Sequence, residues 1–84
     1  MVDIVEIEYT DEFRKAVSKI RDSATRERLV KIIARIEANP DIGKPLAYEL
    51  AGLRSLRLPP FRIIYDHKDD KITLRTFEHR KSAY

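Results

Sequence analysis

The sequence contains no cysteine, and this absence removes two classes of small protein from consideration. Without thiols the chain can form neither a disulfide framework nor a thiolate metal site. Long apolar runs are also missing, since none approaches the roughly 20 residues of a membrane-spanning helix. The opening residues, Met1-Val2-Asp3, carry no basic and apolar signal segment. We therefore expect a cytoplasmic protein with no membrane contact.

The 84 residues are enough for one small domain, which we place at residues 1–84. Hydrophobic residues make up 43% of the chain and charged residues 37%, a balance typical of a globular protein. No repeat or linker divides it. The sequence also offers no convincing cluster of metal ligands, and we expect neither a metal nor another cofactor.

Charge is distributed unevenly along the chain. Residues 1–51 carry nine Lys/Arg and ten Asp/Glu, whereas residues 52–84 carry eight Lys/Arg and four Asp/Glu. The net charge of +3 therefore arises in the C-terminal part. A positive patch favours nucleic acid or an acidic protein as a partner, although a solvated basic face explains the same counts.

Hydrophobic spacing predicts the first half of the fold. Apolar and acidic residues alternate over residues 2–9, which predicts a half-exposed strand. Two segments with helical spacing follow. The first begins after Thr10, and the second begins at a new cap within Asp22-Ser23-Ala24-Thr25 and ends at Asn39-Pro40. We expect an antiparallel helix pair on one face of a sheet. Residues 41–51 then form a loop whose apolar side chains pack under the helices.

Two strands joined at Pro59-Pro60 organise the second half. A turn symmetric about the prolines places Arg57 directly opposite Arg62, because side chains alternate between the faces of a strand. Like charges in this position destabilise a strand pair, so the arrangement indicates a functional role for the two arginines. Two guanidiniums held side by side on a sheet form a binding site for an anion, and phosphate is the obvious ligand. The same register predicts an apolar surface on the other face: Leu56, Leu58, Phe61 and Ile63.

A second turn at Asp69-Asp70 adds a further strand and extends the face that carries the arginines. Counting residues from that turn pairs Arg62 with Phe77 and places Arg75, Phe77 and His79 on the same face as the arginines, although an error of one residue would invert part of the set. Tyr48 and Tyr65 are predicted to be core residues. The complete prediction is an α+β fold of order β-α-α-β-β-β, in which the last three strands form an antiparallel meander and the helices pack on one face.

Several short motifs in this order resemble the RelE/ParE toxin superfamily, and specifically a RelE-like mRNA interferase toxin of a type II toxin–antitoxin system. The resemblance extends over nearly the whole chain. It depends on four segments: Gly52-Leu53, Leu56-Arg57-Leu58, Phe61-Arg62-Ile63-Ile64-Tyr65 and His79-Arg80-Lys81-Ser82-Ala83-Tyr84.

The resemblance implies a metal-independent endoribonuclease that cuts translated mRNA on the ribosome, by attack of a ribose 2′-hydroxyl on the adjacent phosphate. It also implies a cognate antitoxin, for which we expect an acidic or amphipathic helix. Two other functions remain open. A ParE-like toxin with this fold inhibits DNA gyrase, and a degenerate member binds its antitoxin without catalysis.

The chemistry assigns roles to the candidate residues. Arginine stays protonated at ordinary pH, so Arg57, Arg62 and Arg80 are predicted to bind phosphate and stabilise the transition state rather than act as bases. The resemblance matches Tyr84 to the family's C-terminal tyrosine and so implies that it orients or deprotonates the 2′-hydroxyl, and the imidazole of His79 is the chemically natural acid or base. Further RNA contacts are predicted at Arg54, Arg75, Phe77 and Lys81.

Two departures from the family pattern weaken the enzymatic assignment. The ribonuclease members have two lysines on the strand where this chain has Ser55 and Arg57. Another branch of the family uses a glutamate together with a histidine. In this chain Glu49 lies in the corresponding region, but it does not align securely with that glutamate. A structural alternative also exists, in which the paired arginines form ion pairs with nearby acids such as Glu6, Glu8 or Glu78.

Overall fold

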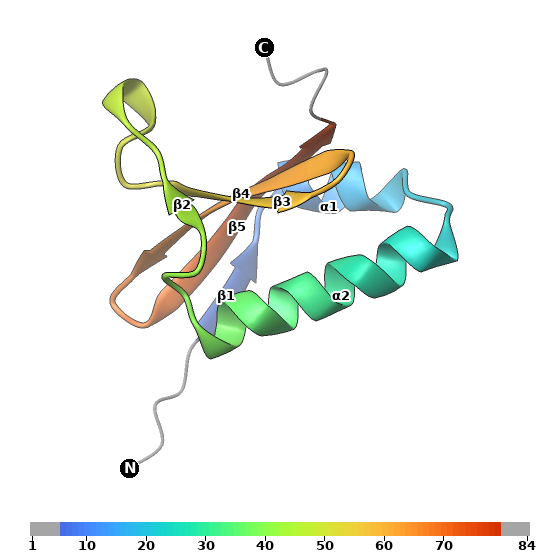
Figure 1. Ribbon diagram of the computed structural model, residues 1–84, viewed down its shortest axis with the longest axis horizontal. Coiled ribbons are helices and arrows are strands. Elements are labelled where there is room, and N and C mark those ends of the chain that lie inside the picture. The colour runs from blue at the N-terminus through green and yellow to red at the C-terminus, as the bar shows by residue number, and fades with distance from the viewer. Residues whose placement is uncertain (1–5, 80–84) are drawn as a thin grey trace.

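A computed structural model describes residues 6–79, so residues 2–5 of the predicted first strand and the candidates Arg80, Lys81 and Tyr84 lie outside the described residues. The predicted α+β order is confirmed. Two short elements are added within the predicted loop, the strand β2 and the 3₁₀ helix η1 (Figure 1). The elements are β1 (Glu6–Tyr9), α1 (Asp11–Ser18), α2 (Ser23–Ala38), β2 (Lys44–Pro45), η1 (Tyr48–Leu50), β3 (Arg54–Leu58), β4 (Phe61–Lys68) and β5 (Lys71–His79).

The strands form one mixed sheet in the order β1-β5-β4-β3-β2. The first strand runs parallel to β5, and the other neighbours are antiparallel. Both helices cover the same face of this sheet, while η1 and its loop rise on the opposite side (Figure 1). We call the sheet surface opposite α1 and α2 the open face.

Side-chain caps begin both helices. The hydroxyl oxygen of Thr10 accepts a hydrogen bond from the backbone N–H of Phe13 (3.1 Å) and donates one to the carbonyl of Arg75 (2.6 Å), which ties the start of α1 to β5. Asp22 caps α2 by accepting from the backbone N–H groups of Ala24 and Thr25. The sequence predicted both helix starts because capping residues precede both apolar stripes.

The hydrophobic core lies between the helices and the sheet. Its helical residues have the predicted spacing, and the sheet contributes alternate residues from β3, β4 and β5. None of the helices within residues 6–79 has the length and hydrophobicity needed to cross a lipid bilayer. The buried core residues are Phe13, Ile20, Leu29, Ile32, Ile36, Leu58, Ile63, Tyr65, Ile72, Leu74 and Phe77.

The first hairpin has the predicted register. Pro59 and Pro60 form the turn, and Arg57 of β3 lies opposite Arg62 of β4. Both arginines belong to the open face, since the alternate residue Ile63 is fully buried under the helices. The structure thus confirms the pairing on which the proposed phosphate site depends.

The second hairpin departs from the predicted register. Pairing agrees from the turn as far as Tyr65 opposite Leu74, and then a β-bulge inserts Arg75 as an extra residue, so that Arg62 pairs with Glu78 instead of Phe77. The placement of Phe77 and His79 on the open face is therefore wrong. Phe77 is only 4% exposed and belongs to the core.

The segment that follows α2 also differs from its prediction. Leu46 and Leu50 were expected under the helices, but they line a groove on the open face together with Leu53 and Ile64. Ile64 is buried there although it points away from the helices. Tyr65 is a core residue as predicted, whereas the prediction for Tyr48 is wrong because this side chain is 96% exposed.

Candidate functional site

The paired arginines differ in their surroundings. The Arg62 side chain is 17% exposed, and its Nη2 lies 3.3 Å from Oε1 of Glu78 on the neighbouring strand. Arg57 is exposed and forms no ion pair with any carboxylate within residues 6–79. The ion-pair alternative is therefore correct for Arg62 with Glu78 and incorrect for Arg57. This leaves the Arg57 guanidinium available to an anionic ligand.

Opposite charges alternate on the rest of the open face. Lys71 forms an ion pair with Glu8, and Nε of Arg75 lies 2.5 Å from Oδ2 of Asp66. The hydrogen bond from Lys71 lowers the pKa of the Glu8 carboxyl, and the same bond raises the pKa of Lys71. These pairs are at least partly exposed and add little stability, but together with Arg62–Glu78 they neutralise three cations of this face.

A groove of about 690 Å³ lies beside Arg62 and Arg75. Its apolar lining comes from one residue of β4 and from the loop between β2 and β3. Carboxylates of Asp11 and Glu12, at the start of α1, lie at the same groove. Its apolar and cationic lining consists of Leu46, Leu50, Leu53, Ile64, Arg62 and Arg75.

Tyr48 begins η1, in the loop whose leucines line the groove, and the sequence did not predict its exposure. It is 96% exposed and has a φ of 58°, in the left-handed region that a bulky side chain rarely adopts. Such a conformation costs on the order of 1–3 kcal/mol and persists only where the surrounding structure enforces it. The available signal was an aromatic residue in a segment with neither strand nor helix periodicity, which we interpreted as a buried anchor.

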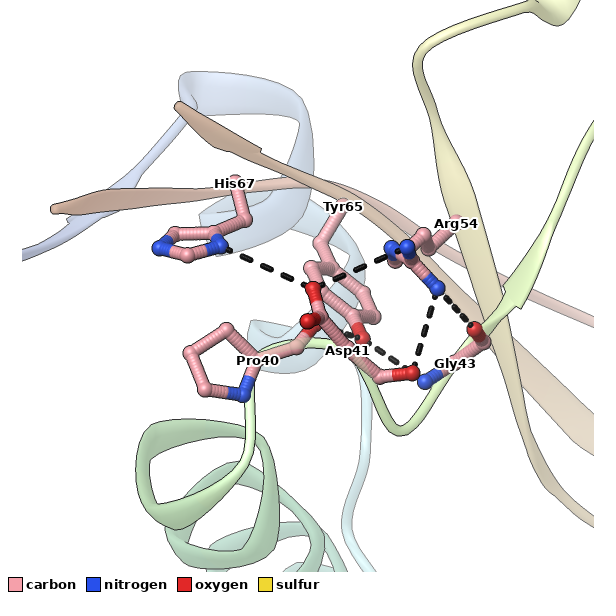
Figure 2. A network of polar contacts seen from close by, with 6 residues as sticks. All are labelled: Pro40, Asp41, Gly43, Arg54, Tyr65 and His67. Atoms are coloured by element: carbon pink, nitrogen blue, oxygen red, sulfur yellow. Dashed lines mark hydrogen bonds and ion pairs between the residues drawn. The ribbon is translucent and has the colours of Figure 1, made fainter. Parts of the chain in front are cut away.

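Arg54 lies on the helix-covered face and holds the chain that leaves α2. Its Nη1 donates hydrogen bonds to the carbonyls of Asp41 (3.1 Å) and Gly43 (2.8 Å), and its Nη2 lies 3.6 Å from the Asp41 carboxylate (Figure 2). The RNA contact predicted for Arg54 therefore has no support in its position, since its guanidinium is engaged with the backbone. This position is set by the pairing of Arg54 with Tyr65 across the hairpin.

Tyr65 completes the same network from the core. Its hydroxyl donates to the carbonyl of Pro40 (2.7 Å) and accepts from the backbone N–H of Gly43 (2.9 Å), as Figure 2 shows. Burial raises the pKa of this phenol. Gly43 is required here because a Cβ at this position would lie 2.7 Å from the Tyr65 hydroxyl oxygen. Together Arg54 and Tyr65 fix the base of the loop that carries Tyr48.

His79 follows Glu78 at the end of β5 and pairs with Phe61. Its ring meets the Phe61 ring edge-on, with centroids 5.5 Å apart, while Phe61 stacks on Phe77 at 4.6 Å. These rings lie on the helix-covered face, so His79 and Arg62 leave adjacent strands on opposite sides. Within residues 6–79 the structure brings together no group of three His, Asp or Glu side chains that suits a metal ion.

Comparison with known families gives the class of protein. A family model described as the ParE toxin of the type II toxin–antitoxin system parDE matches residues 7–84. The chain therefore belongs to this family, within the RelE/ParE superfamily that its motifs resemble, and it is a toxin of a toxin–antitoxin system. The comparison with curated proteins finds no match.

Solved structures of toxins from this superfamily share the fold. The RelBE2 toxin–antitoxin complex of Mycobacterium tuberculosis contains a chain with 25% identity and a TM-score of 0.79, and the alignment covers 90% of this chain and 98% of that one. The YoeB/ParE toxin of Agrobacterium tumefaciens has 17% identity and a TM-score of 0.78, with coverages of 89% and 98%. The intact Escherichia coli RelBE complex gives 16% identity and a TM-score of 0.76, with coverages of 89% and 95%.

Proposed function

We propose that this toxin is a ribosome-dependent endoribonuclease that cuts translated mRNA. The observation that carries the proposal is the Arg57–Arg62 pair, two guanidiniums presented from adjacent strands on the open face. In the reaction, the ribose 2′-oxygen bonds to the adjacent phosphorus while the bond from phosphorus to the 5′-oxygen breaks. The arginines bind the nonbridging phosphate oxygens, on which negative charge accumulates.

The proton transfers require other groups. A base removes the 2′ proton and an acid protonates the departing 5′-oxygen. We assign removal of the 2′ proton to Tyr84, with Arg80 as a further phosphate ligand, whereas His79 lies beside Phe61 on the other side of the sheet from Arg57 and Arg62. Residues 80–84 come directly after β5 in the sequence, and Glu78 near the end of that strand pairs with Arg62, which supports this assignment.

An antitoxin is the expected protein partner. The structural neighbours include toxin–antitoxin complexes, such as the RelB–RelE complex of Methanococcus jannaschii. For this chain we propose a cognate antitoxin whose acidic or amphipathic helix lies over the β3–β4 hairpin. There its carboxylates meet Arg57, which has no acidic partner within residues 6–79. Binding at that position excludes RNA.

Inhibition of DNA gyrase is the second candidate function, and two observations favour it. The family model that matches is that of the ParE toxin. In addition, ion pairs neutralise Lys71, Arg75 and Arg62, so the open face is less cationic than a nucleic-acid surface usually is. On this alternative the Arg57 region contacts a protein instead of RNA.

One experiment separates these functions. The toxin is induced without its partner, and mRNA 5′ ends are mapped on translating ribosomes for wild type, Arg57→Ala and Arg62→Ala. Arg35→Ala, which removes an exposed arginine from α2, is the matched control. New ends that disappear in both hairpin variants, but not in the control, support the nuclease. Uncut messages together with inhibited supercoiling by purified gyrase support the second candidate, and normal growth indicates an inert antitoxin-binding member.

A further inference from the structure

We propose that Tyr48 is a stacking platform for an unpaired nucleobase of the RNA strand that Arg57 holds through a phosphate. This inference rests on the proposed ribonuclease function and names a residue that contacts a flanking nucleotide. It starts from the exposed tyrosine on its left-handed backbone, for which the fold itself has no use.

The loop that carries Tyr48 is rigid. Its two ends are joined by a hydrogen bond from the N–H of Leu46 to the carbonyl of Leu53 (2.9 Å), and its tip is closed by one from the N–H of Ala51 to the carbonyl of Tyr48 (3.1 Å). Below these bonds, the Arg54 and Tyr65 network fixes the chain (Figure 2). An aromatic side chain on such a support loses little conformational freedom when it binds.

The loop also lies on the correct side of the sheet. It rises from the open face (Figure 1), and the strand pairing puts Arg57 and Arg62 on that same face. Arg57 is four residues beyond Leu53 along β3, or roughly 13 Å at the rise of an extended strand. The groove beside this loop is lined by Leu46, Leu50 and Ile64 together with Arg62 and Arg75.

This combination fits single-stranded RNA. Its unstacked bases bind to aromatic and apolar side chains, and its phosphates bind to guanidiniums. The carboxylates of Asp11 and Glu12 in the same groove repel phosphate, so the RNA backbone follows the arginines and its bases turn toward the leucines and Tyr48. A duplex cannot bind in this way because its bases are already stacked on each other.

The test is a titration of purified toxin with a fluorescently labelled, unstructured, single-stranded RNA, followed by anisotropy at several salt concentrations. We expect Tyr48→Ala to weaken binding about tenfold without changing the salt dependence, because stacking is not ionic. Tyr48→Phe keeps the ring and is expected to bind like wild type. Arg57→Ala is expected to weaken binding and to reduce the salt dependence. The duplex of the same sequence is expected to show no effect of Tyr48→Ala.

The outcomes distinguish this inference from the proposed function. Equal binding by Tyr48→Ala and wild type, with loss of binding in Arg57→Ala, overturns the stacking role and leaves the RNA-binding arginines in place. If the wild-type toxin binds no RNA, the stacking role fails, and the mRNA ends mapped on translating ribosomes decide the nuclease proposal separately. Binding that ignores Arg57→Ala overturns the phosphate role of Arg57, on which both proposals rest. Because Tyr48 is exposed, its variants are expected to keep the circular dichroism spectrum of the wild type, which checks that they fold.

Discussion

Replacing Tyr65 by phenylalanine tests the network that anchors the loop after α2. The substitution keeps the buried ring and removes only the hydroxyl, which donates to the Pro40 carbonyl and accepts from the Gly43 N–H. No cavity forms at the ring, so the loss comes from the two backbone groups left without their partner. An unsatisfied buried group costs about 1–3 kcal/mol, and Gly43 is buried.

We therefore expect Tyr65→Phe to lower the free energy of unfolding by about 2 kcal/mol. For a chain of this size that loss corresponds to a fall in Tm of roughly 8–16 °C. Urea denaturation followed by circular dichroism measures the first quantity, and a thermal scan measures the second. Tyr48→Phe is the matched control, since its hydroxyl belongs to an exposed side chain and its removal is expected to change neither quantity. Equal stability of the two variants would refute the argument.

The same variant has a defined pH dependence. Burial raises the pKa of Tyr65 above the value of 10.0 for an ordinary tyrosine, so the folded protein holds the phenolic proton more tightly than the unfolded chain does. The stabilisation from this group is thus complete below pH 10.0 and decreases as the pH rises above that value. The stability difference between wild type and Tyr65→Phe should shrink in that range, and a constant difference up to the highest accessible pH would contradict the assignment.

Three further predictions follow from the structure. Phe77→Ala should lower the free energy of unfolding by about 3–5 kcal/mol in urea titrations, because it empties a core position, whereas an exposed ring would give a loss near zero. Asp22→Ala should lower the Tm near neutral pH and match wild type in acid. Hydrogen bonds from Thr25 lower the pKa of Asp22 below 3.8, so the contribution of this carboxylate to stability is present above that pH and is lost as the pH falls through the lowered value. Glu78→Gln should strengthen RNA binding and increase its salt dependence by about one ion, since Arg62 loses its carboxylate partner; weaker binding would instead assign Glu78 to the RNA site.

The sequence was sufficient for much of the fold because its signals are local. Thr10 and Asp22 precede apolar stripes at helical spacing, and the prolines at 59 and 60 fix a tight turn. With that turn in place, the pairing of Arg57 with Arg62 follows by counting residues. No information from distant parts of the chain was needed for these elements.

The remaining errors came from features without a local signal. The bulge at Arg75 changes the register of β5, and nothing in the adjacent residues distinguishes it from a regular strand. Phe77 was therefore assigned to the wrong face. The leucines after β2 were expected under the helices because apolar residues usually pack there, yet Ile64 presents apolar surface on the open face, and they cover it. That choice depends on the tertiary structure.

The bulge at Arg75 also has a consequence for comparing toxins of this family. One inserted residue moves every later side chain of β5 to the face opposite the one that regular alternation would give it. Two chains that differ by such an insertion can align well in sequence and still direct equivalent residues to opposite sides of the sheet. Residues near the end of this strand are therefore best matched across chains by their strand neighbours, with Glu78 compared to whichever residue faces the counterpart of Arg62.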